Sequence, residues 1–82
     1  MNTKKDSKGN IYIELENIRI TYVEKQKRSN LKNWPNADVL RIQAKKDGIS
    51  NSLHRGAEFP LYKKEKSIYN LIERLTKLMD DI

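Results

Sequence analysis

Few residues of this chain are suited to catalytic chemistry. His54 is the only histidine and there is no cysteine, so a general base would have to be one imidazole, and thiolate nucleophiles and thiolate metal sites are excluded. Carboxylates such as Glu14, Asp38 and Glu58 are scattered, and they match neither a paired-carboxylate hydrolase nor a metal cage. The glycines are isolated and form no phosphate-binding loop. We therefore expect no enzymatic activity, no metal and no cofactor.

The distribution of charge favours the binding of a polyanion instead. The net charge of +6 lies wholly in residues 1–66, which carry fifteen basic and eight acidic side chains, whereas residues 67–82 carry two and three. Proteins bind single-stranded nucleic acid with cations that follow the phosphates and flat side chains that stack on bases. The candidate contact residues of these kinds are Tyr12, Arg19, Lys25, Lys27, Arg28, Trp34, Arg41, Gln43, Lys45 and His54. An ordinary solvated sheet face has a similar composition, and a loop tryptophan often anchors its loop in the core.

The segments that carry these residues have mostly the period of β-strands. Residues 11–23 alternate apolar and polar side chains and change phase at Glu16-Asn17, where we expect a tight hairpin or, second, a bulge in one long strand. Residues 37–46 and 49–61 predict two further strands, joined by a type I′ turn at Asp47-Gly48. Residues 24–36 have no period and form a basic loop.

The Asp47-Gly48 turn also predicts a register for the last two strands. It pairs Ile42 with Leu53 and Arg41 with His54, which leaves Arg55 on the apolar face. A bulge near Arg55-Gly56 or a longer turn would correct this misfit. The predicted core face of the sheet consists of Ile11, Ile13, Leu15, Ile18, Ile20, Leu40 and Ile42.

The C-terminal segment predicts one amphipathic helix. Ser67 is a candidate N-cap, and the apolar residues that follow it at helical spacing are Ile68, Leu71, Ile72, Leu75, Leu78, Met79 and Ile82. The predicted fold is therefore α+β, with a four-stranded antiparallel sheet followed by one long C-terminal amphipathic helix packed on one face. Residues 1–10 are expected to be a disordered basic leader, and residues 11–82 a single domain.

Size and composition add expectations about assembly and location. A chain of 82 residues buries only about 60% of its unfolded surface, so we expect a homodimer, formed through the C-terminal helix. No apolar segment resembles a signal peptide or reaches the roughly 20 residues of a membrane span, which predicts a cytoplasmic protein. The abundance of Lys, Asn and Ile is typical of AT-rich genes, such as those of low-GC bacteria and their phages or other mobile elements.

Parts of the chain resemble the PUR single-stranded nucleic-acid-binding proteins. Residues 11–17 (IYIELEN) are similar to their aromatic-rich first strand, residues 40–42 (LRI) to their second strand with its exposed arginine, and residues 71–82 to their closing helix. Plant Whirly proteins and the positive-cofactor coactivators share a related plan. The resemblance implies a curved antiparallel sheet, dimerisation through helices, and strand binding on the concave face with Tyr12 and Arg41 as contact residues. Because this chain has one such unit, a homodimer would replace the tandem repeats of PUR proteins.

Three interpretations of function follow, and the sequence leaves all three open. The first is a module that binds single-stranded DNA or RNA. The second is a small inhibitor or adaptor of a phage or mobile element, whose basic face meets an acidic surface of a host protein. The third is a β-ribbon that binds double-stranded DNA.

Overall fold

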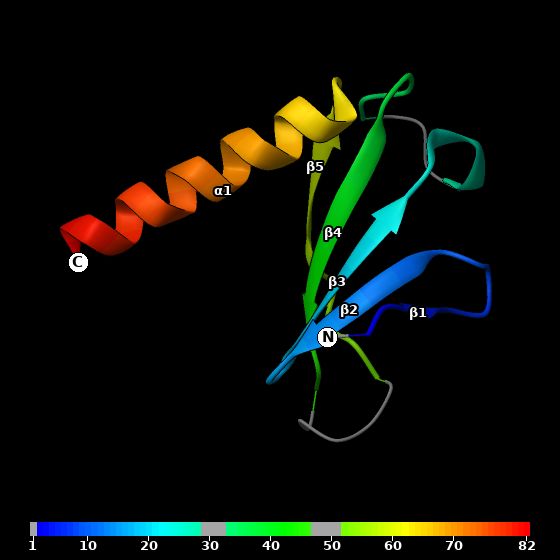
Figure 1. Cartoon of the computed structure of the whole chain (residues 1–82). Coiled ribbons are helices and arrows are strands. Elements are labelled where there is room, and N and C mark those ends of the chain that lie inside the picture. The colour runs from blue at the N-terminus through cyan, green and yellow to red at the C-terminus, as the bar shows by residue number, and fades with distance from the viewer. Residues whose placement is uncertain (1, 29–32, 47–51) are drawn as a thin grey trace.

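The computed structural model describes residues 2–28, 33–46 and 52–82, which form an antiparallel sheet and one C-terminal helix (Figure 1). The sheet has five strands in the order β1-β2-β3-β4-β5. Their bounds, with a 3-10 helix η1 and the helix α1, are β1 Lys4–Lys5, β2 Ile11–Leu15, β3 Ile18–Val23, η1 Lys25–Lys27, β4 Asp38–Ala44, β5 Ala57–Leu61 and α1 Lys64–Asp81. The predicted α+β class is confirmed, with one strand more than expected.

The additional strand lies in the segment that we expected to be a disordered leader. β1 pairs with β2, so that Lys4 lies opposite Tyr12. The turn between them is held by Asp6, whose Oδ1 accepts the N–H groups of Lys8 and Asn10 at 2.9 and 2.8 Å. An aspartate that bonds to backbone N–H groups ahead of it is a common turn-forming device. Residues 4 and 5 are therefore a strand of the sheet, and residues 6–10 form the hydrogen-bonded turn that joins it to β2, where we expected a disordered leader.

The phase change at residues 16 and 17 is a hairpin, as we expected in preference to a bulge. Leu15 and Ile18 face each other across the two-residue turn, and the pairing continues from there along both strands. The residue with positive φ is Glu16, at 53°, although asparagine is usually the better tolerated residue in that conformation. The alternation of apolar and polar side chains on either side of the turn, rather than the residue type in it, therefore determines that a hairpin forms here.

The predicted register between the last two strands is wrong by several residues. Ile42 lies opposite Ala57 rather than Leu53, and Arg41 lies opposite Glu58 rather than His54. An isolated bridge joins Lys45 to Leu53, so three steps along β4 match four steps on the other side. One extra residue therefore lies between positions 53 and 57, where we considered a bulge. The predicted Asp47-Gly48 turn lies outside the described residues.

Gly56 belongs to this irregular segment and lies against β4. A Cβ added there would overlap the carbonyl oxygen of Ile42 and crowd the side chain of Gln43. We expect Gly56→Ala to lower the free energy of unfolding by about 1–3 kcal/mol, because β4 or the irregular segment must shift. Urea denaturation measures the change, with exposed His54→Ala as the neighbouring control. An unchanged midpoint for Gly56→Ala would show that the segment moves freely.

The two faces of the sheet differ in composition as predicted, but the fully buried residues do not lie where we expected them. Cross-strand pairs such as Ile13 with Ile20 and Ile20 with Ile42 place the predicted core residues on one face, which we call the apolar face. These residues are only half-buried or exposed. The nearly inaccessible pair Val23 and Val39 lies on the opposite, polar face. On the polar face, Asn33 and Trp34 from the segment between β3 and β4 line a cavity with Arg41 and Gln43, whereas the apolar face has no comparable cover among the described residues.

The carboxylate of Asp38, at the start of β4, accepts hydrogen bonds from β3 and from η1. Asp38 accepts the Tyr22 hydroxyl at 2.5 Å and the Lys25 backbone N–H at 2.8 Å. The bond from Tyr22 is the main cause that lowers the pKa of the Asp38 carboxyl, and the Lys25 N–H and nearby lysine charges add to it against the effect of burial. Burial and this carboxylate raise the pKa of the Tyr22 phenol, which therefore remains a donor.

This network predicts a pH dependence of stability. Because the pKa of Asp38 is lower in the folded than in the unfolded state, its carboxylate stabilises the fold above about pH 4, and this contribution is lost as the pH falls further through the folded-state pKa. We expect Asp38→Asn to be less stable near neutral pH and to lose less stability on acidification. Urea titrations between about pH 7 and pH 2 measure both slopes. Parallel slopes in the two proteins would contradict this role.

The C-terminal helix begins earlier than predicted and covers less of the sheet. α1 starts at Lys64, and Ser67 lies within its first turn, where its Oγ accepts the Lys63 N–H at 3.2 Å. Its principal contacts are with β5, none of its residues is buried, and it extends away from the sheet (Figure 1). The expectation that the helix packs across one face of its own sheet is therefore not met. No helix in the described part of the chain is long and apolar enough to cross a membrane.

Candidate functional site

The polar face gathers side chains from three central strands. Strand pairing places Tyr12 opposite Thr21, Arg19 opposite Gln43, and Thr21 opposite Arg41, so these residues share one surface. This is the surface that the alternation in the sequence predicted. It contains two groups of polar side chains, one around Glu14 and one around a cavity beside Trp34.

The first group is a carboxylate surrounded by cations. Glu14 Oε2 lies 2.8 Å from Lys45 Nζ and 3.2 Å from Arg19 Nη2, and its other oxygen is 3.9 Å from Lys4 Nζ. The bond from Lys45 is the main cause that lowers the pKa of the Glu14 carboxyl. Arg19 is buried, and its guanidinium carbon lies 4.2 Å from the centroid of the Tyr12 ring. The guanidinium of Arg19 therefore stacks on the Tyr12 ring, and its charge is directed at the Glu14 carboxylate.

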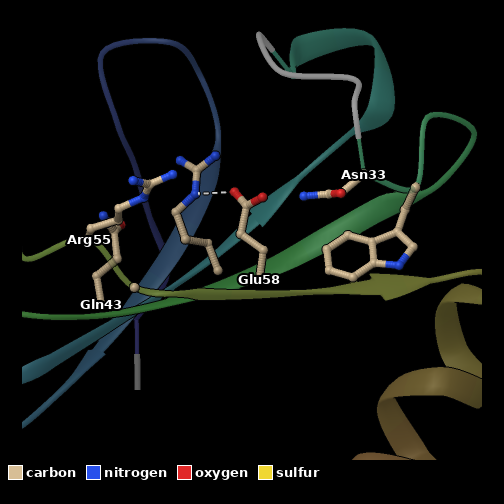
Figure 2. A pocket seen from close by; sticks show the side chains of 7 residues that line it. Asn33, Gln43, Arg55 and Glu58 are labelled. Carbon is tan, nitrogen blue, oxygen red and sulfur yellow. Dashed lines mark hydrogen bonds and ion pairs between the residues drawn. The ribbon is translucent and has the colours of Figure 1, made fainter.

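The second group lines a cavity of about 370 Å³ that is open to solvent. Its lining residues are Asn33, Trp34, Arg41, Gln43, Arg55, Gly56 and Glu58. Figure 2 shows Arg55 and Gln43 at one side, Asn33 at the other, and Glu58 between them. The cavity thus offers one indole ring, two guanidinium groups, two amides and a single carboxylate. These groups can stack on a planar ring, donate to phosphate oxygens and bond to the edge of a base.

The charge of Arg41 in this cavity is held in place by Glu58. Arg41 Nε lies 2.6 Å from Glu58 Oε2, and both side chains are about one-third exposed. This distance is that of a short, charge-assisted hydrogen bond. Gln43 is also oriented, because its amide nitrogen donates to the carbonyl of His54 at 3.2 Å. Two of the polar groups that line the cavity are therefore fixed before any ligand arrives.

The loop that carries Trp34 is held by a buried arginine. Arg28 Nη1 donates to the carbonyls of Trp34 and Ala37 at 2.6 and 3.1 Å, and Nη2 donates to that of Asn33 at 2.7 Å. Trp34 itself has a φ of 49°, an uncommon conformation for a bulky residue. We expected Arg28 to contact nucleic acid, but its guanidinium is directed into the protein, where carbonyl dipoles compensate its charge.

The other candidate residues lie apart from the cavity. Lys25 and Lys27 are exposed on η1, and the Nζ of Lys27 donates to the Gly9 carbonyl at 3.2 Å beside a smaller cavity. His54 is exposed next to Gln43. Of the ten candidates, the structure brings Trp34, Arg41 and Gln43 together at the cavity, and it brings Tyr12, Arg19 and Lys45 together around Glu14.

Sequence reasoning missed three charged or amide residues of the cavity, namely Asn33, Arg55 and Glu58. Arg55 and Glu58 were hidden by the wrong register. The misfit of Arg55 on the apolar face was the signal that its segment had to shift.

Neither a metal cluster among the described residues nor a match to a known protein points to a function of this surface. Among the described residues, no cluster of three or more His, Cys, Asp or Glu side chains is placed to hold a metal ion. Comparisons of the chain with protein-family models, with curated proteins and with solved structures find no match. The resemblance to PUR proteins therefore stays a prediction.

Proposed function

We propose that this protein binds single-stranded DNA or RNA across the polar face of its sheet. The observation that carries the proposal is the cavity that Trp34 lines together with Arg41 and Arg55. Aromatic rings stack on any base, and arginines follow the phosphates, so this combination suits a strand with unpaired bases. The strand would continue along the face toward Lys45 and Lys4, which neighbour Glu14.

The charges of the face support a ligand that is bound through its backbone. The two groups contain five cationic side chains, Lys4, Arg19, Arg41, Lys45 and Arg55, against the carboxylates Glu14 and Glu58. A base in the cavity can pair with the Asn33 and Gln43 amides, but most of the attraction comes from phosphates. We therefore expect affinity that depends strongly on salt and little on base sequence.

The first test is titration of a labelled strand of about 20 nucleotides, a length that exceeds the footprint of a small strand-binding domain. Fluorescence anisotropy is recorded at low and near-physiological salt, beside a duplex of the same length. Micromolar or tighter binding that favours the single strand at both salt concentrations supports the proposal. Absent binding, or equally weak binding to duplex and single strand that vanishes with salt, contradicts it.

Arg41 gives a sharper prediction for the same assay. We expect Arg41→Ala to weaken binding about equally for all sequences and to lower the slope of log K against log salt by about one, because one phosphate contact is lost. Glu58 loses its partner in this variant, so Arg41→Ala in combination with Glu58→Gln serves as the matched control. An unchanged slope in both variants would remove Arg41 from the site.

The second candidate function is that of a small adaptor, of the kind found in phages and mobile elements, that binds a host protein. It is favoured by the exposed apolar side chains of α1, of which Leu78 and Met79 are more than half accessible. A second copy of the chain would also cover this surface. The mass of the pure protein in solution distinguishes these two occupants.

A further inference from the structure

The folded chain exposes more surface than its mass requires. Its accessible area is 6629 Å² for 9.7 kDa. A compact monomer of this mass exposes about 5,100 Å² by the scaling of area with mass. The excess of roughly 1,500 Å² per chain would amount to about 3,000 Å² in a pair of chains, which lies in the range of obligate homodimer interfaces.

Much of the exposed apolar surface lies on the helix. Ile68 and Leu71 at its start are half-buried. Farther along the same stripe, exposure is 51% for Ile72, 55% for Leu75, 58% for Leu78, 67% for Met79 and 93% for Ile82. The rise shows that α1 diverges from the sheet as it proceeds. An amphipathic stripe of this kind is stable in water only when something covers it.

The apolar face of the sheet is the second uncovered surface. Ile11 and Leu15 on it are 44% and 54% exposed, although they are large aliphatic residues in paired strands. The helix approaches this face at its base, where Lys64 Nζ lies 5.1 Å from the centroid of the Tyr22 ring. Within the described residues, one molecule therefore presents a helix stripe and a sheet face that are both largely exposed.

The two surfaces match each other in size and charge. A helix of 18 residues is about 27 Å long, and five strands spaced about 4.8 Å apart form a sheet roughly 20 Å wide. The apolar face contributes mainly Ile, Leu and Phe side chains, and residues 67–82 have nearly balanced charge. Both halves of a helix-on-sheet interface are thus present in the same chain.

We propose that the protein forms a two-fold dimer in which α1 of each protomer lies across the apolar sheet face of its partner. A two-fold axis satisfies both surfaces at once, since each helix covers a face and each face receives a helix. This arrangement differs from a dimer made by helix–helix contact alone. It leaves both basic polar faces on the outside, so it is independent of the strand-binding proposal.

The first measurement is the mass in solution, by light scattering or sedimentation equilibrium. We expect twice the 9.7 kDa of one chain. Leu75→Glu places a charge in the stripe and should yield monomers or strongly weakened dimers at the same concentration. Asn70→Glu adds the same charge on the polar side of α1 and should remain dimeric. A monomeric mass for the unaltered protein would overturn the proposal.

Cross-linking decides where the helix lies, even if Leu75→Glu fails to fold. The chain has no cysteine, so Ile13→Cys on the sheet and Leu78→Cys on the helix are unique attachment points for a short bismaleimide. The two variants are mixed, unfolded and refolded together. We expect covalent dimers that join one Ile13→Cys chain to one Leu78→Cys chain, and far fewer in either variant alone.

Three other outcomes would overturn the proposal. Efficient cross-linking of Leu78→Cys with itself would indicate paired helices. Cross-linking within one chain of the double variant, without an increase in mass, would indicate a helix that folds back on its own sheet. A monomer that associates only with a foreign protein would indicate that the exposed apolar surface binds a host protein, as the adaptor hypothesis states.

Discussion

Replacing the buried Arg28 with methionine should strongly destabilise the protein. The variant keeps much of the side-chain volume but removes three hydrogen bonds to the carbonyls of Asn33, Trp34 and Ala37. Carbonyl oxygens that lose a charged donor in a buried position typically cost 1–3 kcal/mol each, and water can compensate those near the surface. We therefore expect the free energy of unfolding to fall by about 3 kcal/mol, measured by urea denaturation.

Two further variants separate the charge of Arg28 from its geometry. Arg28→Lys keeps the charge, but one ammonium group does not span three carbonyls, so its stability should lie between those of the wild type and Arg28→Met. Lys25→Met removes a charge from the exposed η1 and should change stability little. If Arg28→Met and Lys25→Met had equal effects, the loop would not depend on Arg28. Arg28→Met should also weaken strand binding, because the backbone that carries Trp34 is released.

Replacing Trp34 with alanine should weaken strand binding while leaving the fold largely intact. Base–aromatic stacking contributes about 1–3 kcal/mol per base, which corresponds to a loss of roughly 5- to 150-fold in affinity. The bonds from Arg28 reach the backbone of residue 34, so they persist in the variant. The measurement is anisotropy with the same labelled strand, and Trp34→Phe should recover part of the affinity.

The control for this prediction is an exposed aromatic residue elsewhere. Tyr69 on α1 is 68% exposed and lies away from the cavity, so Tyr69→Ala should bind like the wild type. Equal affinity of Trp34→Ala and the wild type would exclude the indole from the site. In that case Trp34 would serve only to close the loop, which was the alternative that its sequence context suggested.

The sequence was sufficient where short-range pattern decides the structure. The phase change at Glu16-Asn17 predicted the hairpin, because side chains that alternate on both sides of a two-residue turn pair in one way only. The same alternation separated the polar face from the apolar face correctly. The helical spacing of the apolar residues predicted the helix, although the helix begins at Lys64 rather than after a cap at Ser67.

The sequence was insufficient where the outcome depends on which segments meet in space. Local pattern does not show that Asn33 and Trp34 lie against the polar face, so it did not reveal that Val23 and Val39 are almost inaccessible there. In the sequence, Arg28 resembles any other cationic residue of a loop. Its burial is explained by the three backbone carbonyls to which its guanidinium donates in the folded chain. The bridge from Lys45 to Leu53 already lies three residues away from the predicted register, and one extra residue before β5 adds a fourth; this shift hid Arg55 from the candidate site.

The position of Trp34 gives the protein a built-in optical probe. It is the only tryptophan of the chain, so emission excited beyond the absorption of the four tyrosines comes from one indole beside the cavity. A base stacked on that indole should quench its emission in unlabelled protein. The apolar face lies on the other side of the sheet, so association of two chains should leave the spectrum nearly unchanged. Ligand binding and self-association can thus be followed separately in one cuvette.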